Sequence, residues 1–259
     1  MIWKVNLLLL CLSIYQVAGS VRILGGQDTQ IHRAPYQVSL RYKANATAPY
    51  IQRCAGAIYN SHVILTTAMC VQDLVIQRLQ VVAGDRDRTG SKGNVYRVQR
   101  IVIQDDFDEW FMDNDLALLL LDHELNLKNQ GLSGISIAKD QPVAGNLGTI
   151  FGWGAKDDSQ SSETLQIAQV KIVDVAQCRL SYGQDRITKA MLCAGSYNNN
   201  HVIDACQGDA GGALVVNGAA VGLISWGSGC GRPNYPGVYT NLVYLKGWIE
   251  QQVAIMKII

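Results

Sequence analysis

The chain has 259 residues, of which 22 are basic and 21 acidic, so its formal net charge is only +1, and 48% of its residues are hydrophobic. This balance provides no excess positive charge for binding nucleic acid or an anionic membrane surface. The roughly 240 residues that follow the N-terminal segment could form one large domain or two small ones.

The first 20 residues have the layout of a secretory signal peptide. Lys4 precedes the apolar run "VNLLLLCLSIY", and small residues follow at positions 18–20. The run is shorter than the roughly 20 apolar residues of a membrane span, and a buried N-terminal helix is the alternative reading. The sequence therefore predicts a signal peptide at residues 1–20 and a secreted, extracellular protein without a membrane partner.

The cysteines favour disulfide bonds. Of seven cysteines, Cys11 lies in the signal segment, and the even number that remains suits an oxidising compartment. No CxxC pair is present, which argues against zinc or redox chemistry, so no metal or cofactor is expected. The acceptor triplet that begins at Asn45 predicts glycosylation of an exposed loop.

Hydrophobic periodicity along the chain favours strands. "YQVSLRY" (36–42) alternates, "DLALLLL" (115–121) is typical of a buried strand, and "ALVVNGAAVGLISWG" (213–227) predicts a hairpin that turns at Asn217–Gly218. A polar, glycine-rich passage at 129–148 could separate two halves. Only the C-terminus has a clear helical pattern, formed by Leu245, Trp248, Ile249 and Val253.

Six segments, in order and with fitting gaps, resemble the trypsin-like serine proteases. They are "RILGG" (22–26), "TTAMC" (66–70), "DNDLALL" (113–119), "GWG" (152–154), "DACQGDAGG" (204–212) and "SWGSGCGRPNYPGVYT" (225–240). The resemblance implies an all-β domain at 23–259, made of two perpendicular six-stranded β-barrels with a C-terminal α-helix. The expected bounds are about 23–128 and about 142–243 for the barrels and about 244–256 for the helix. The implied disulfides are Cys54–Cys70, Cys178–Cys193 and Cys206–Cys230.

The same resemblance locates the reacting groups of the family. Its mechanism needs a hydroxyl nucleophile, an imidazole base and a carboxylate that orients the base. The corresponding positions hold Ala210, Met69 and Asp115, and neither a methyl group nor a thioether can perform the first two roles. The histidines lie outside these motifs, at His32, His62, His123 and His201. The sequence therefore predicts that the chain is not an enzyme and that Met69 fills the space of the imidazole.

The resemblance also implies an activation step and a site for calcium. Cleavage after Arg22, the end of a short propeptide at 21–22, would free the amine of Ile23 to pair with Asp209. Asp85 lies near one calcium-ligand position of the family, but Val95 falls where a second acidic ligand is expected, so no metal is predicted.

The substrate pocket of the family has counterparts in this sequence. Asp204 matches the acid at the pocket floor, and the backbone N–H groups of Gly208 and Ala210 match the oxyanion hole. The remaining pocket residues that the resemblance implies are Ser225, Trp226, Gly227 and Gly237. The segment 196–203 and Tyr235 are unusual, and either could fill the pocket, so the sequence leaves open whether the pocket is accessible.

Within the family, the sequence looks most like the scabies mite inactivated protease paralogues of the mite group 3 allergen family. That subgroup implies a binding protein that inhibits host defence, such as complement, through its outer surface. The alternatives are a decoy that captures protease substrates or inhibitors in its cleft, and a residual hydrolase. Neither the partner nor the oligomeric state follows from the residues.

Overall fold

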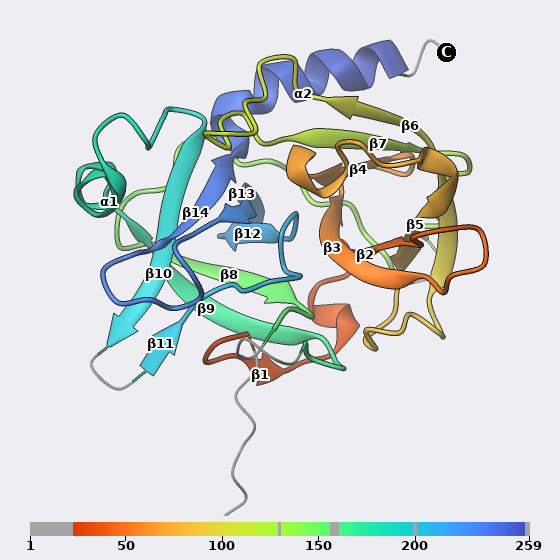
Figure 1. Cartoon of the computed structure of the whole chain (residues 1–259), viewed down its shortest axis with the longest axis horizontal. Coiled ribbons are helices and arrows are strands. Elements are labelled where there is room, and N and C mark those ends of the chain that lie inside the picture. Colours follow the sequence, from red (N-terminus) through yellow and green to blue (C-terminus); the bar gives the residue numbers. More distant parts are fainter. Residues whose placement is uncertain (1–22, 129–130, 156–160, 199–200, 257–259) are drawn as a thin grey trace, which may run out of the picture.

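The N-terminal half of the chain folds into a closed β-barrel (Figure 1). The computed structural model describes residues 23–128, 131–155, 161–198 and 201–256. Six antiparallel strands close in the order β2-β3-β4-β7-β6-β5, and the two segments predicted at 36–42 and 115–121 are β2 and β7. The strands are β2 (Gln37–Tyr42), β3 (Ile51–Ile58), β4 (Val63–Thr66), β5 (Leu79–Ala83), β6 (Asn94–Ile103) and β7 (Ala117–Leu121).

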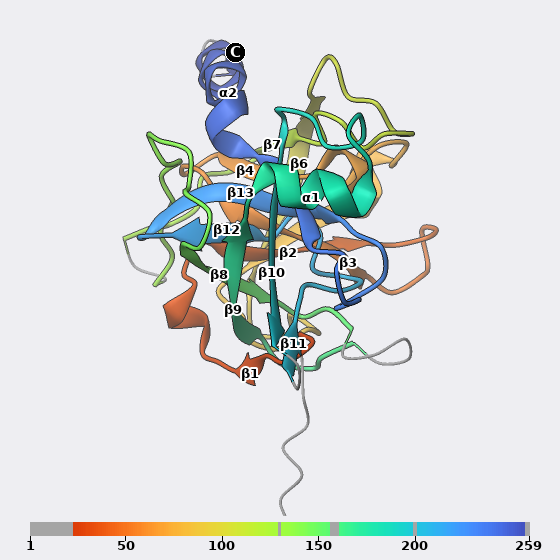
Figure 2. The same ribbon diagram turned by 90° about the vertical axis from the view of Figure 1, so that its left-hand side faces the viewer.

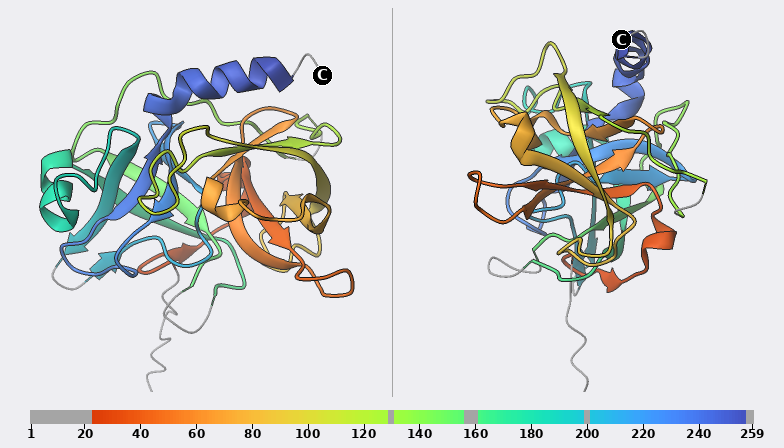
Figure 3. Two further views of the ribbon diagram at one scale, coloured as in Figure 1. Left: turned by 45° about the horizontal axis from the view of Figure 1, so that its top comes forward. Right: turned by 90° about the vertical axis from the view of Figure 1, so that its right-hand side faces the viewer.

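A second barrel follows in the chain and lies beside the first (Figure 3, left). Its strands run in the order β9-β8-β12-β13-β14-β10, and pairing of β9 with β10 closes the ring. They are β8 (Leu147–Gly152), β9 (Gln166–Val173), β10 (Met191–Asn198), β12 (Ala213–Val216), β13 (Ala219–Trp226) and β14 (Gly237–Asn241). Two short strands extend its edges, β1 (Gln27–Asp28) on β9 and β11 (His201–Ile203) on β10.

The predicted hairpin is confirmed. β12 and β13 pair on either side of Asn217 and Gly218, whose φ angles of 51° and 80° lie in the left-handed region. Asparagine and glycine adopt such angles at little cost, and two successive positive φ angles match the right-handed twist of the paired strands. The fold predicted from the resemblance, two six-stranded barrels with a C-terminal helix, is confirmed as well.

Two α-helices flank the barrels. The C-terminal α2 (Leu242–Met256) begins two residues before the expected position, packs on β13, and crosses above both barrels (Figures 1 and 3). Its buried side chains are Leu242, Leu245, Ile249, Val253 and Met256. No helix was predicted at α1 (Val175–Tyr182), which lies at the outer side of the second barrel (Figure 2). The Asp174 carboxylate caps α1 by accepting from the N–H of Ala176.

Three 3-10 turns and three disulfides complete the described structure. The turns are η1 (Ile31–Arg33), η2 (Ala68–Cys70) and η3 (Ile76–Arg78). The disulfides join Cys54 to Cys70, Cys178 to Cys193 and Cys206 to Cys230, which are the pairs that the resemblance implies. Within the described ranges, neither helix has the length and apolar character needed to cross a bilayer. The predicted signal peptide and propeptide, residues 1–22, lie outside the described residues.

Candidate functional site

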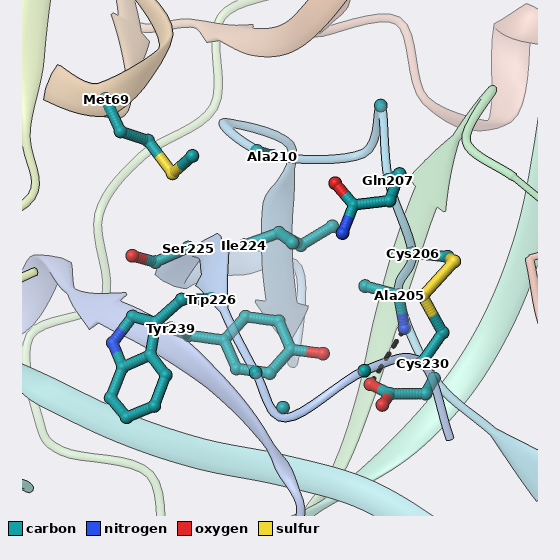
Figure 4. Close-up of a pocket in the computed structure, with 15 residues that line it drawn as sticks. Met69, Ala205, Cys206, Gln207, Ala210, Ile224, Ser225, Trp226, Cys230 and Tyr239 are labelled. Atoms are coloured by element: carbon teal, nitrogen blue, oxygen red, sulfur yellow. Dashed lines mark hydrogen bonds between the residues drawn. A yellow bond between two sulfur atoms is a disulfide. The ribbon is translucent and has the colours of Figure 1, made fainter. Parts of the chain in front are cut away.

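Most of the site residues predicted from the sequence line one cavity of about 170 Å³ (Figure 4). Met69, from η2 of the first barrel, lies at one end of the cavity shown in Figure 4. The Cys206–Cys230 disulfide of the second barrel lies at the other end. The other lining residues belong to the second barrel: Asp204, Ala205, Gln207, Gly208, Ala210, Ile224, Ser225, Trp226, Gly227, Gly229, Gly237 and Tyr239.

Asp204 places a buried carboxyl group in this cavity. The residue is 2% exposed, its Oδ1 accepts from the N–H of Ala205 at 2.9 Å, and its Oδ2 accepts from the N–H of Gly231 at 2.8 Å. Burial raises the pKa of Asp204 to about 7, and the two N–H donors oppose that rise only in part. A cation that entered the cavity would favour the ionised form and gain a charge-assisted hydrogen bond.

The glycines beside Asp204 keep the cavity open. A Cβ atom at Gly237 would lie 2.8 Å from Asp204 Oδ1, so any side chain there would collide with the carboxyl group. A Cβ atom at Gly227 would lie 3.5 Å from the Gly229 carbonyl oxygen and 3.9 Å from the Gly237 Cα and the Tyr182 hydroxyl, so it would narrow the cavity without a severe clash. Because neither residue has a side chain, a long ligand side chain has a path to Asp204.

Tyr235, which the sequence left as one possible obstruction of the pocket, does not fill it. Tyr235 is not part of the cavity lining; its ring packs edge-on against Tyr182, 5.4 Å between centroids. Tyr182 in turn packs against Trp226 and donates from its hydroxyl to the carbonyl of Pro236. These contacts hold the Tyr235 ring in an aromatic row beside the cavity.

The segment 196–203 extends the sheet. Its backbone continues β10 into a hairpin with β11, in which Ser196 pairs with Ile203 and Asn198 with His201. Ile203 is not among the residues that line the cavity, and the side chains of 196–202 lie outside the described atoms, so filling of the pocket by this segment stays a prediction. Residues 199–200 lie outside the described residues.

Asp115 is held by the hydrogen bonds that surround the site. Its Oδ1 accepts from the N–H of Met69 at 2.9 Å, and its Oδ2 accepts from the Ser225 hydroxyl at 2.6 Å. Burial raises the pKa of Asp115 to about 6, against the opposing effect of these donors. The backbone at position 69 therefore keeps its contact with the carboxylate, while the half-buried Met69 side chain packs against the core.

Gly208 and Ala210, which line the cavity, carry the two backbone N–H groups of the expected oxyanion hole. The Gly208 carbonyl accepts from the Gln52 side-chain amide, and the Ala210 carbonyl accepts from the N–H of Ala55, both at 2.8 Å, so both carbonyls face the first barrel. Among the described residues, no acceptor bonds to the N–H of Gly208 or Ala210. Two unpaired donors on one cavity wall are suited to a carbonyl oxygen that acquires negative charge.

Asp209 lies behind this wall and is fully buried. Its carboxylate accepts from the N–H groups of Gly154 at 2.7 Å and Cys206 at 3.0 Å, and burial raises its pKa to about 7. Ile23 is also fully buried, and the next residue, Leu24, pairs with Asp204 through its carbonyl. The first described residues therefore already lie against the loop that carries Asp204 and Asp209.

The other candidates lie apart from the cavity. Asn45 is exposed, and its side-chain oxygen accepts from backbone N–H groups of its own loop. Asp85 is buried and accepts from the N–H groups of Asp87 and Lys92. His32, His62 and His123 are exposed and line no part of the cavity, and the His201 side chain lies outside the described atoms.

One residue beside the cavity, Arg186, was not predicted from the sequence. The Arg186 guanidinium lies 4.7 Å from the ring centroid of Trp226 and 5.2 Å from that of Phe111. It therefore connects the cavity wall with the loop between β6 and β7. The sequence signal was the pair of adjacent aromatic residues, Trp110 and Phe111, within a stretch rich in acidic residues.

Comparisons with known proteins agree on one family. A family model described as Trypsin matches residues 23–249. The chain is 41% identical over 255 residues to Trypsin eta of Drosophila melanogaster, covering 97% of each chain, and 42% identical over 234 residues to Trypsin eta of Drosophila erecta, covering 90% of each. A solved structure described as neuropsin, a serine protease expressed in the limbic system of mouse brain, has a TM-score of 0.78 at 30% identity. That match covers 89% of this chain and 100% of the other.

These relatives contradict the prediction that the chain is not an enzyme, because the proteins that align with it over most of its length are named trypsins. Met69 and Ala210 remain the side chains at the positions where the family resemblance expects an imidazole and a hydroxyl. These two side chains affect which reaction steps are possible in the cavity, but they do not change the family to which the chain is assigned. The chain belongs to the trypsin-like family of serine proteases.

Proposed function

We propose that this protein recognises an arginine or lysine side chain of a protein ligand in the Asp204 pocket. The observation that carries the proposal is a buried carboxyl group in an open cavity, with no cation of the described residues within ion-pair distance. A buried carboxylate without a partner is costly, and a guanidinium or ammonium group would relieve that cost. The relatives are named trypsins, which supports the same substrate class.

Hydrolysis of the bound ligand would have to use the groups that the cavity contains. The N–H groups of Gly208 and Ala210, which no described acceptor binds, would serve as the oxyanion hole, and Asp115 supplies a carboxylate. The thioether of Met69 and the methyl group of Ala210 cannot transfer a proton or attack a carbonyl carbon. A Ser–His–Asp relay is therefore not the route by which these side chains could cleave a peptide bond.

Binding of benzamidine, a small aromatic cation, tests the proposal. Calorimetric titration of the protein with benzamidine should show one binding site. Asp204→Asn should weaken benzamidine binding at least tenfold. The melting temperature of the free variant should equal or exceed that of the unmodified protein. Asp174→Asn, at the exposed cap of α1, is the matched control and should bind normally. Equal affinity in the Asp204→Asn variant would refute the assignment of the pocket. Parallel measurement of arginine-amide hydrolysis separates recognition from cleavage.

Three finer expectations remain predictions. They are secretion directed by residues 1–20, membership in the scabies mite subgroup, and inhibition of host complement through the outer surface. Tyr235 does not line the cavity, so its ring does not block a ligand side chain from the Asp204 pocket. We therefore favour the alternative hypothesis, capture of a protein ligand in the cleft.

A further inference from the structure

An aromatic and cationic surface adjoins the Asp204 pocket. We define it as the cleft rim: Trp110, Phe111, Arg186 and Trp226. Trp226 also lines the cavity, so the rim is continuous with the pocket. Trp110 is 83% exposed and Phe111 is 53% exposed, although both are large and apolar. Adjacent exposed aromatic residues beside a binding cavity are typical of a protein contact surface.

The backbone at the tip of the β6–β7 loop, which carries the exposed rings, is fixed by hydrogen bonds. The backbones of Asp108 and Asp113 bond to each other in both directions, and Asp108 Oδ1 accepts from the N–H groups of Trp110 and Phe111. A rigid tip loses little conformational entropy when a partner binds. The rim is therefore preformed.

Arg186 gives the rim its charge. Its guanidinium lies against the rings of Phe111 and Trp226, and its Nη1 donates to the Trp110 carbonyl at 3.1 Å. No carboxylate of the described residues lies within ion-pair distance of it. Stacking on two rings leaves the remaining N–H groups in the plane of the guanidinium, which is the direction from which a carboxylate is bound.

Two acidic residues of the neighbouring loop are already engaged in hydrogen bonds. The Asp108 carboxylate caps the loop tip, and Asp113 Oδ1 accepts from the Thr188 hydroxyl and the N–H of Asn114. Since no described carboxylate lies within ion-pair distance of Arg186, a ligand carboxylate can fill that role. A ligand segment that inserts a basic side chain beside Trp226 passes next to Arg186, because the two residues are in contact.

We propose that the cleft rim binds an acidic side chain, aspartate or glutamate, carried by the same ligand segment whose basic side chain enters the Asp204 pocket. The proposal rests on the proposed function and adds a sequence preference to it. The preferred ligand is then bipolar, with a cation for Asp204 and an anion for Arg186. Arginine and aromatic side chains are also the residue types that dominate binding energy at protein interfaces.

Synthetic peptides provide the test. Each capped peptide carries one arginine and a single glutamate placed in turn at each of the four positions on either side, and a matched set carries glutamine instead. Calorimetry at low salt should show that glutamate at one or two positions tightens binding about five- to tenfold. Arg186→Gln should abolish this preference, Arg186→Glu should reverse it, and Arg33→Gln, an exposed arginine of η1, should leave it unchanged.

Benzamidine separates the two proposals, because it binds in the Asp204 pocket and carries no anionic group that could bind Arg186. Benzamidine affinity that is unchanged in Arg186→Gln, together with a lost glutamate preference, supports the rim proposal. Absence of any glutamate preference, or a preference that survives Arg186→Gln, overturns it while benzamidine binding still stands. Sedimentation of the free protein tests whether a second copy of this chain occupies the rim. Self-association that disappears in Arg186→Gln would assign the rim to dimer formation and overturn the proposal.

Discussion

Cleavage after Arg22 should change how the stability of the fold depends on pH, through Asp209. In the uncleaved chain, burial raises the pKa of Asp209 from 3.8 to about 7, with two backbone N–H groups as its partners. Because the folded pKa lies above the unfolded value, the protonated carboxyl group stabilises the fold at low pH. That contribution is complete below pH 3.8 and is lost as the pH rises through about 7.

The cleaved chain should behave differently because the Ile23 ammonium supplies a cation for Asp209. The pair lowers the folded pKa of Asp209 and raises that of the amine above its ordinary value of about 7.7–8.0. The amine then contributes stability that is present below that value and fades as the pH rises through its raised pKa. Near pH 7 the cleaved chain should be more stable by about 2–4 kcal/mol, since one pKa unit corresponds to about 1.4 kcal/mol.

Differential scanning calorimetry from pH 4.5 to 8 can measure this difference. A chain that begins at Ile23 is compared with one made uncleavable by Arg22→Gln. At roughly 2–4 °C per kcal/mol for a domain of this size, the melting temperatures should separate by about 5–15 °C near pH 7 and converge toward pH 4.5. Asp115 and Asp204 titrate in both forms, so their effects cancel. Asp209→Asn should remove the separation, and identical pH profiles of the two unmodified forms would refute the pairing.

Three further predictions follow from the site and from the exposed loop. Met69→His combined with Ala210→Ser should raise arginine-amide hydrolysis by several orders of magnitude, up to about 10⁶-fold, whereas each single change should raise it little, because base and nucleophile act as a unit. Gly237→Ala should abolish benzamidine binding in calorimetry, because its Cβ would lie 2.8 Å from Asp204 Oδ1, and normal binding would contradict the pocket geometry. Asn45→Gln should remove any glycan mass from protein secreted by eukaryotic cells, and an unchanged mass shift would place the glycan elsewhere.

The sequence predicted the strands well where each strand has its own pattern. β2 alternates, β7 is uniformly apolar, and the β12–β13 turn needs the asparagine and glycine that the chain provides. The sequence pattern did not predict α1, because that helix has almost no apolar face. Cys178 is its only buried residue among those described, and a capping aspartate stabilises its N-terminus. Amphipathic periodicity cannot detect a helix that buries so little.

The site was predicted through resemblance, and its errors came from contacts between distant segments. Tyr235 could be identified as unusual, but only the fold shows that Tyr182, more than fifty residues earlier, holds its ring beside the pocket. Arg186 depends on Phe111 and Trp226, which lie on different barrels. No local pattern records such a meeting, because each of the three residues is ordinary in its own segment.

The cavity keeps its shape because its backbone is held independently of the two replaced side chains. The N–H of Met69 still bonds to Asp115, and the carbonyl of Ala210 still bonds to Ala55, so neither contact requires an imidazole or a hydroxyl. Asp204 belongs to another part of the wall, anchored by the Gly231 N–H and by its pairing with the first described residues. Recognition and bond breaking therefore depend on separate groups in this fold, and substitutions at positions 69 and 210 can alter the second while the first remains intact.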